Sequence, residues 1–172
     1  RVQSTFLTAN MASYGMIVVS PEHPSRDLTN VLGFTASGDR EDSVDDLLQS
    51  LDLITAAGDD AASPFNGHVD ATRVAAVGHS AGGGTVLGAA TDERIDGYVS
   101  LASGVLRGRS ADGSTTTTIA YDMPDKPSLF VAGSLDGIVP AETVTRPAYE
   151  AAPSPSTLWI IEGVGHTGFD DF

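Results

Sequence analysis

Three residues of this chain could together convert a weak hydroxyl into a nucleophile: Ser80, Asp136 and His166. A serine hydroxyl attacks poorly at neutral pH, so it needs a histidine to take its proton and an acid to orient that histidine. Ser80 is the centre of a Gly-x-Ser-x-Gly pentapeptide, Gly78-His79-Ser80-Ala81-Gly82. The partners follow in the order serine, acid, histidine that accompanies this motif. The set therefore predicts covalent chemistry at Ser80.

The segments on either side of Ser80 predict a sharp turn. The apolar run 73–77 is typical of a buried strand, and the glycine- and alanine-rich run 81–90 is typical of a tightly packed helix. A turn between them strains the backbone of its central residue, and only glycine or an equally small residue fits at the flanks. We therefore expect an exposed Ser80 hydroxyl above the edge of a sheet.

The two partner residues also follow apolar, strand-like runs. Residues 128–132 precede Asp136, and residues 157–161 precede His166. Taken singly, Asp136-Gly137 is a common turn pair and His166 could be a solvated loop residue. Their order and their position after strands agree, however, so we interpret the three residues as one triad. All three are expected at the carboxyl ends of strands, where open α/β sheets bind ligands.

The rest of the chain predicts alternating strands and helices around a parallel sheet. The helical spacing of apolar residues between Val44 and Ile54 predicts a helix that begins near Arg40 and ends at Gly58. A second helix is expected over 141–152. The strand candidates are apolar throughout, as expected when helices cover both faces of a sheet. These candidates are 16–20, 73–77, 97–102, 128–132 and 157–161.

Three other histidines compete with His166 for the role of base. His79 is next to Ser80 in the turn, so its side chain should point away from the hydroxyl and pack or bond structurally. His23 follows the first expected strand and is a candidate for the pocket rim, while His68 lies in a loop and is expected in solvent. The apolar side chains of Trp159 and Phe130 lie within strand runs and are expected in the core.

With these residues in place, the chain resembles the α/β-hydrolase superfamily. Within it, the chain is most similar to the dienelactone-hydrolase-like and bacterial platelet-activating-factor-acetylhydrolase-like branch, which includes cutinase-like polyester hydrolases. The resemblance implies an α/β-hydrolase fold, a mostly parallel sheet with helices on both faces, and a serine esterase that needs no cofactor. The segments that carry the resemblance are 14–24, 40–42, 73–84, 133–140 and 165–166.

One departure from this family concerns the oxyanion site. The resemblance implies that the backbone N–H of Ala81 is one oxyanion donor and that a loop after the third strand supplies the other. We find no such loop, because residues 16–20 resemble the fourth strand and residues 1–13 the helix before it. Without a third strand, two buried strand edges would have unpaired groups, at about 1 to 3 kcal/mol each.

We therefore expect residues 1–172 to be the carboxyl-terminal portion of a single α/β-hydrolase domain that is incomplete at its N-terminus. A missing N-terminal segment or a second chain would then complete the sheet, and a rearranged sheet is the remaining alternative. Residues 103–127 are polar and rich in turns, and lie where hydrolases often carry a lid or a pocket wall.

Composition limits the classes of partner. The net charge of −14 argues against binding to nucleic acid or to an anionic membrane. No apolar run has the length of a transmembrane helix, and secretion and a cytoplasmic location both remain open. The chain has no cysteine, which excludes disulfides and thiolate metal sites. We predict no bound metal, because loop carboxylates usually face water.

The sequence thus predicts hydrolysis of carboxylic esters with short or medium acyl chains, on small-molecule, lipid-like or polyester substrates. Other interpretations stay open. The chain could be a non-catalytic binding or scaffold protein, or a fragment that cannot stabilise an oxyanion. Among enzymes, acyltransferases and peptidases use the same triad.

Overall fold

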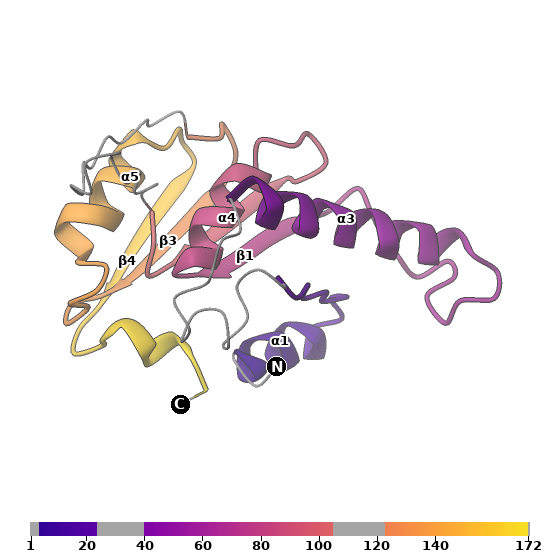
Figure 1. Cartoon of the computed structure of the whole chain (residues 1–172), viewed down its shortest axis with the longest axis horizontal. Coiled ribbons are helices and arrows are strands. Elements are labelled where there is room, and N and C mark those ends of the chain that lie inside the picture. The colour runs from indigo at the N-terminus through magenta and orange to yellow at the C-terminus, as the bar shows by residue number, and fades with distance from the viewer. Residues whose placement is uncertain (1–3, 24–39, 105–122, 172) are drawn as a thin grey trace. The chain divides into compact units, whose positions relative to one another are not determined.

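The computed structural model describes residues 4–23, 40–104 and 123–171 (Figure 1). The chain divides into two compact units, Arg1–Val74 and Ala75–Phe172. Each unit is described by itself. Within the described parts of the chain, no helix is both long enough and apolar enough to cross a membrane. The polar stretch 103–127, which lies where hydrolases often carry a lid or a pocket wall, falls mostly outside the described residues, because 105–122 are not among them.

The first unit contains two helices, α1 over Thr5–Ser13 and α3 over Arg40–Asp59. The bounds of α3 confirm the helix that the spacing of apolar residues predicts. The prediction of a strand over residues 16–20 is wrong, because this segment forms no strand and its Met16 residue is 57% exposed. An apolar run becomes a strand only when a neighbour pairs with its backbone, and the described part of this unit has no other strand.

The second unit is built on a four-stranded sheet in the order β1-β2-β3-β4, and every neighbouring pair is parallel. Each of its strands matches one that the apolar runs predict, with ends that differ by at most two residues. Among the described residues, β1 has a neighbouring strand on one side only. The strands are β1 over Ala75–His79, β2 over Gly97–Leu101, β3 over Ser128–Gly133 and β4 over Ser156–Ile161.

The helices of this unit pack on one face of the sheet. Helix α4 (Ala81–Ala89) joins β1 to β2, and its Gly83 approaches the Ser100 side chain. The connection from β3 to β4 contains a π-helical turn, η2 (Ala141–Thr145), followed by α5 (Arg146–Ala151), so the single helix expected over 141–152 is two elements. Parallel strands added in one direction through right-handed crossovers place every crossover helix on the same side.

Aromatic contacts confirm which face is covered. Phe130 is fully buried and meets the ring of Tyr149 in α5. Its neighbour in β2 is Ser100, the residue that faces α4. Residues paired in a parallel sheet share a face, so α4 and α5 cover the same one. The expectation that Phe130 is a core residue is thus confirmed.

The opposite face of this sheet is covered by a short 3₁₀ turn, η3 (His166–Phe169), whose Phe169 packs with Ala102 and Val131. Beyond this contact Trp159 in β4 is 58% exposed, so its expected place in the core is wrong. Because β4 is an edge strand, its alternate side chains stay exposed where no helix covers them. Among the described residues of this unit, no helix lies over that part of the sheet.

Candidate active site

Ser80 lies on a tight turn between β1 and α4, with φ 55° and ψ −118°. Such angles cost a non-glycine residue about 1 to 3 kcal/mol and persist only where the surrounding structure imposes them. The contact that imposes these angles is at Gly78, where a Cβ would lie 2.3 Å from the carbonyl oxygen of Gly82. Only glycine permits this approach, so the strand and the helix hold Ser80 in its strained turn.

The second glycine of the motif behaves differently from the prediction. A Cβ added at Gly82 would meet no described atom within 4 Å, whereas one at Gly83 would lie 2.5 Å from the Ser103 Cβ. The expectation that both flanks of Ser80 are too crowded for a side chain is therefore wrong at Gly82. The crowding lies one residue later, because Gly83 is on the face of α4 that packs against the sheet.

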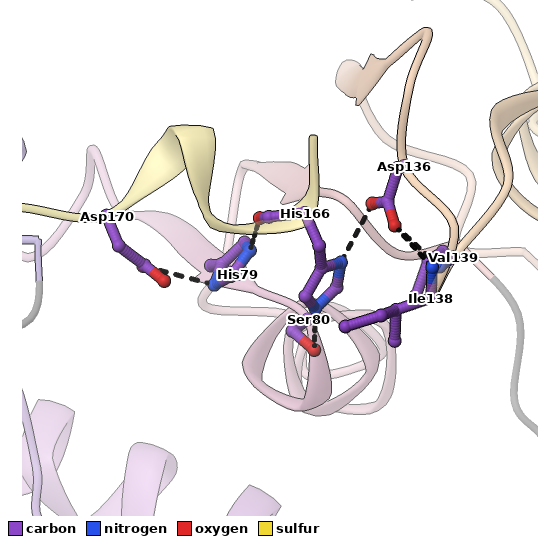
Figure 2. Close-up of polar contacts among 7 residues, drawn as sticks. All are labelled: His79, Ser80, Asp136, Ile138, Val139, His166 and Asp170. Carbon is purple, nitrogen blue, oxygen red and sulfur yellow. Dashed lines mark hydrogen bonds and ion pairs between the residues drawn. The ribbon is translucent and has the colours of Figure 1, made fainter. Parts of the chain in front are cut away.

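The three residues that the sequence singles out come together in a hydrogen-bonded row (Figure 2). His166 Nδ1 lies 2.8 Å from Asp136 Oδ2, and His166 Nε2 lies 2.8 Å from Ser80 Oγ. An ionised carboxylate only accepts, so Nδ1 carries the hydrogen and donates it to Asp136. Nε2 is then left to accept from the Ser80 hydroxyl, which is the tautomer that a general base needs.

Asp136 is held in one orientation by its own loop. Its Oδ1 accepts hydrogen bonds from the backbone N–H groups of Ile138, at 2.9 Å, and Val139, at 2.7 Å. Burial alone would raise the pKa of this carboxyl, but the hydrogen bonds that it accepts from Val139, His166 and Ile138 outweigh burial and hold the pKa below its ordinary value. The side chain is therefore an oriented anion at neutral pH.

The loops that carry Asp136 and His166 are joined to each other. Leu135 N–H donates to the Val164 carbonyl at 2.9 Å, and Gly163 N–H donates to the Ser134 hydroxyl at 2.9 Å. Both loops leave neighbouring parallel strands, β3 and β4. These two bonds therefore set the separation of acid and base through the backbone. The Ser134 hydroxyl is a contributor that the sequence pattern alone did not indicate.

Helix α4 begins at the residue directly after the nucleophile. Ala81 is the first residue of this helix, directly after Ser80. The first amides of a helix have no acceptor within it, and they form a region of partial positive charge. The Ser80 carbonyl already accepts from Gly84 N–H at 3.2 Å. The assignment of the Ala81 amide as an oxyanion donor stays a prediction.

His79 has contacts that the sequence did not specify. Its Nε2 lies 2.9 Å from the His166 carbonyl oxygen, and its Nδ1 lies 3.3 Å from Asp170 Oδ1. The predicted structural role of His79 agrees with these bonds. The importance of Asp170 was missed, and the only signal in the sequence was an acidic residue four positions after His166.

The remaining histidines lie in the first unit. His23 Nδ1 pairs with Asp46 Oδ2 at 2.8 Å, and His68 is exposed in its loop. The assignment of His23 to a pocket rim stays a prediction. Within the described ranges, no three His, Asp or Glu side chains gather as a metal site would require. The absence of a metal and of a cofactor likewise stays a prediction.

These features define the α/β-hydrolase class: a parallel sheet, a strained serine between a strand and a helix, and an acid and a histidine after later strands. Comparison with protein families gives the narrower group. The family model described as PET hydrolase-like matches residues 3–167, so the chain belongs to that family of ester hydrolases. A comparison with curated proteins found no match.

Proposed function

We propose that the chain hydrolyses carboxylic esters by forming an acyl-enzyme on Ser80. The observation that carries this proposal is the unbroken row from Asp136 through His166 to Ser80, with both hydrogen bonds at 2.8 Å. Family membership supports ester hydrolysis in general. The triad geometry supports Ser80 as the nucleophile, His166 as the base and Asp136 as the residue that orients the base.

The first half of the reaction forms the acyl-enzyme. Ser80 Oγ attacks the ester carbonyl carbon while His166 Nε2 takes the hydroxyl proton. Asp136 stabilises the imidazolium through Nδ1–H and keeps the ring in its tautomer. The tetrahedral oxyanion accepts a hydrogen bond from the Ala81 N–H at the start of α4, where the helix dipole favours negative charge. The alcohol leaves with the proton that His166 returns to it.

The second half releases the acid. A water molecule attacks the acyl carbonyl as His166 Nε2 removes its proton, and the collapse of the second tetrahedral intermediate returns the proton to Ser80 Oγ. No redox step is needed, since every proton moves between Ser80, His166, water and the leaving alcohol. The same chemistry serves any ester whose carbonyl can reach Ser80.

The surface beside the triad supports an apolar substrate. Leu135 and Ile138 flank Asp136 on its loop and are 68% and 62% exposed. Figure 2 shows the Ile138 side chain projecting toward Ser80. Exposed apolar side chains beside a polar reaction centre favour an acyl or aryl group over a charged one. We therefore propose short or medium acyl esters, lipid-like esters and, from the family description, polyesters as the substrate class.

Intact-mass spectrometry with a fluorophosphonate probe tests the nucleophile. The wild-type chain should gain one adduct, Ser80→Ala should gain none, and Ser13→Ala, which removes an exposed hydroxyl of α1, should label like wild type. An unlabelled wild-type chain would contradict the proposal and favour a binding or scaffold role. Ester assays with a competing alcohol then separate hydrolysis from acyl transfer, because a transferase would give the exchanged ester as its main product.

A further inference from the structure

His79 is directed by the sheet toward the turn that carries His166. Successive side chains of a strand point to opposite faces. Gly78 faces the N-terminal turn of α4, so the next residue, His79, faces the side where η3 lies. Its ring centroid is 4.9 Å from that of His166 and 5.9 Å from that of Phe169. The residue before the nucleophile therefore packs behind the base and not into the reaction centre.

The two ring nitrogens of His79 face the two ends of η3. At the first residue of the turn, the His166 carbonyl oxygen lies 2.9 Å from Nε2. A carbonyl only accepts, so Nε2 carries a hydrogen and donates it. Just after the last residue of the turn, Asp170 Oδ1 lies 3.3 Å from Nδ1, a contact that is an ion pair only when the ring carries both hydrogens. The imidazole thus hydrogen-bonds the start of the turn through Nε2, while Nδ1 lies near Asp170 without a hydrogen bond (Figure 2).

The contact between His79 and η3 is shielded from water. The side chains of His79 and Asp170 are 8% and 5% exposed, so water competes little for them. The segment that leads into His166 contains Gly163, with φ 76°, and Gly165, so its own backbone restrains it weakly. Asp136 orients the imidazole of His166, but it does not hold the His166 backbone. The bonds at Gly163 and Val164 hold the segment before His166, and the hydrogen bond from His79 Nε2 holds the His166 carbonyl itself. We call this contact of His79 with η3 the clamp.

We propose that His79 is a positioning residue that holds η3 in place and so keeps His166 Nε2 within reach of Ser80 Oγ. This inference rests on the proposed role of His166 as the base. Because the clamp acts on the geometry of proton transfer and His79 does not face the reaction centre, its loss should slow the chemical step and leave substrate binding unchanged. A small displacement of a base is known to cost large factors in rate.

The test compares two substitutions at His79 in the full chain. His79→Gln retains an N–H donor close to the position of Nε2, while His79→Phe keeps an aromatic ring and removes the donor. With p-nitrophenyl butyrate, we expect His79→Phe to lower kcat about ten- to hundredfold with KM within about twofold. His79→Gln should restore kcat to within about threefold of wild type. Thermal unfolding of each variant, and fluorophosphonate labelling of each, accompany the kinetics.

The outcomes separate this inference from the proposed function. If the wild-type chain is not labelled at Ser80, the proposed function fails and this inference fails with it. If wild type is labelled and folded His79→Phe turns over at the wild-type rate, only the inference is wrong. It is also wrong if KM rises in place of the fall in kcat, or if Gln and Phe lose kcat equally. Should His79→Phe not fold, His79→Asn provides the same contrast, because its shorter amide cannot reach the carbonyl.

Discussion

The backbone of Val164 passes so close to Gly133 that a Cβ at Gly133 would lie 2.1 Å from the Val164 carbonyl oxygen. Gly133 ends β3 and Val164 precedes His166 by two residues. The same carbonyl accepts a hydrogen bond from Leu135 N–H. The loop of the acid and the loop of the base therefore meet at a point where no side chain fits.

This contact predicts a large effect of Gly133→Ala. The added methyl group must push the Val164 backbone away, so we expect a loss of about 1 to 3 kcal/mol in the free energy of unfolding, together with much slower fluorophosphonate labelling. Gly137→Ala is the matched control, because a Cβ there would meet no described atom within 4 Å. Urea unfolding and fluorophosphonate labelling of both variants test this prediction. If the two variants have the same stability and the same labelling rate, the close approach of Val164 to Gly133 is contradicted.

The two glycines of the serine motif should respond in opposite ways. Gly78→Ala places a Cβ 2.3 Å from the Gly82 carbonyl oxygen, so this variant should fail to fold or lose several kcal/mol of stability. A Cβ at Gly82 would have no described atom within 4 Å, and alanine favours the helix at this position near the start of α4. The free energy of unfolding of Gly82→Ala should therefore lie within about 0.5 kcal/mol of the wild-type value. Denaturant unfolding of the pair tests this order, and a Gly82→Ala variant as destabilised as Gly78→Ala would contradict it.

Replacing the acid should leave the fold intact and remove most activity. Asp136→Asn keeps an oxygen that can accept from Ile138 and Val139, but its amide group would donate to His166 Nδ1 and impose the wrong tautomer. We expect kcat to fall about 10³- to 10⁴-fold. The measurement is ester turnover beside a circular dichroism spectrum. A variant within tenfold of wild type would place the acid elsewhere.

Asp136 should also contribute to the pH dependence of stability. Its pKa in the folded chain lies below the ordinary value of 3.8. A carboxyl with a depressed folded-state pKa stabilises the fold above its unfolded pKa, and this contribution is lost as the pH falls through the folded value. Urea unfolding of wild type should therefore weaken below about pH 4 more steeply than that of Asp136→Asn. Parallel pH profiles for the two chains would contradict the assignment.

The exposed tryptophan gives a test that needs no mutation. Trp159 is the only tryptophan of the chain and its side chain is 58% exposed in β4. Its fluorescence emission should be red-shifted in the folded protein and strongly quenched by acrylamide. A blue-shifted, poorly quenched emission would show that something covers this face of the sheet in solution.

The sequence by itself determined which residues form the row of acid, base and nucleophile. The reason is that parallel strands bring their carboxyl ends to one edge, so any residue that follows an apolar run of strand length arrives there. Four of the five expected strands and the helix over Arg40–Asp59 could be predicted in the same way, from local pattern alone. Helix α4 followed from the small residues after Ser80.

Only the tertiary structure decided the features that depend on distant neighbours. Residues 16–20 have the composition of a strand, but strand formation requires a partner backbone, which a local pattern cannot supply. Trp159 is apolar and yet exposed, because the edge position of β4 and not the residue type decides its burial. The clamp of His79 on η3 joins residues far apart in the chain, and such contacts exist only once the sheet has brought β1 beneath the turn.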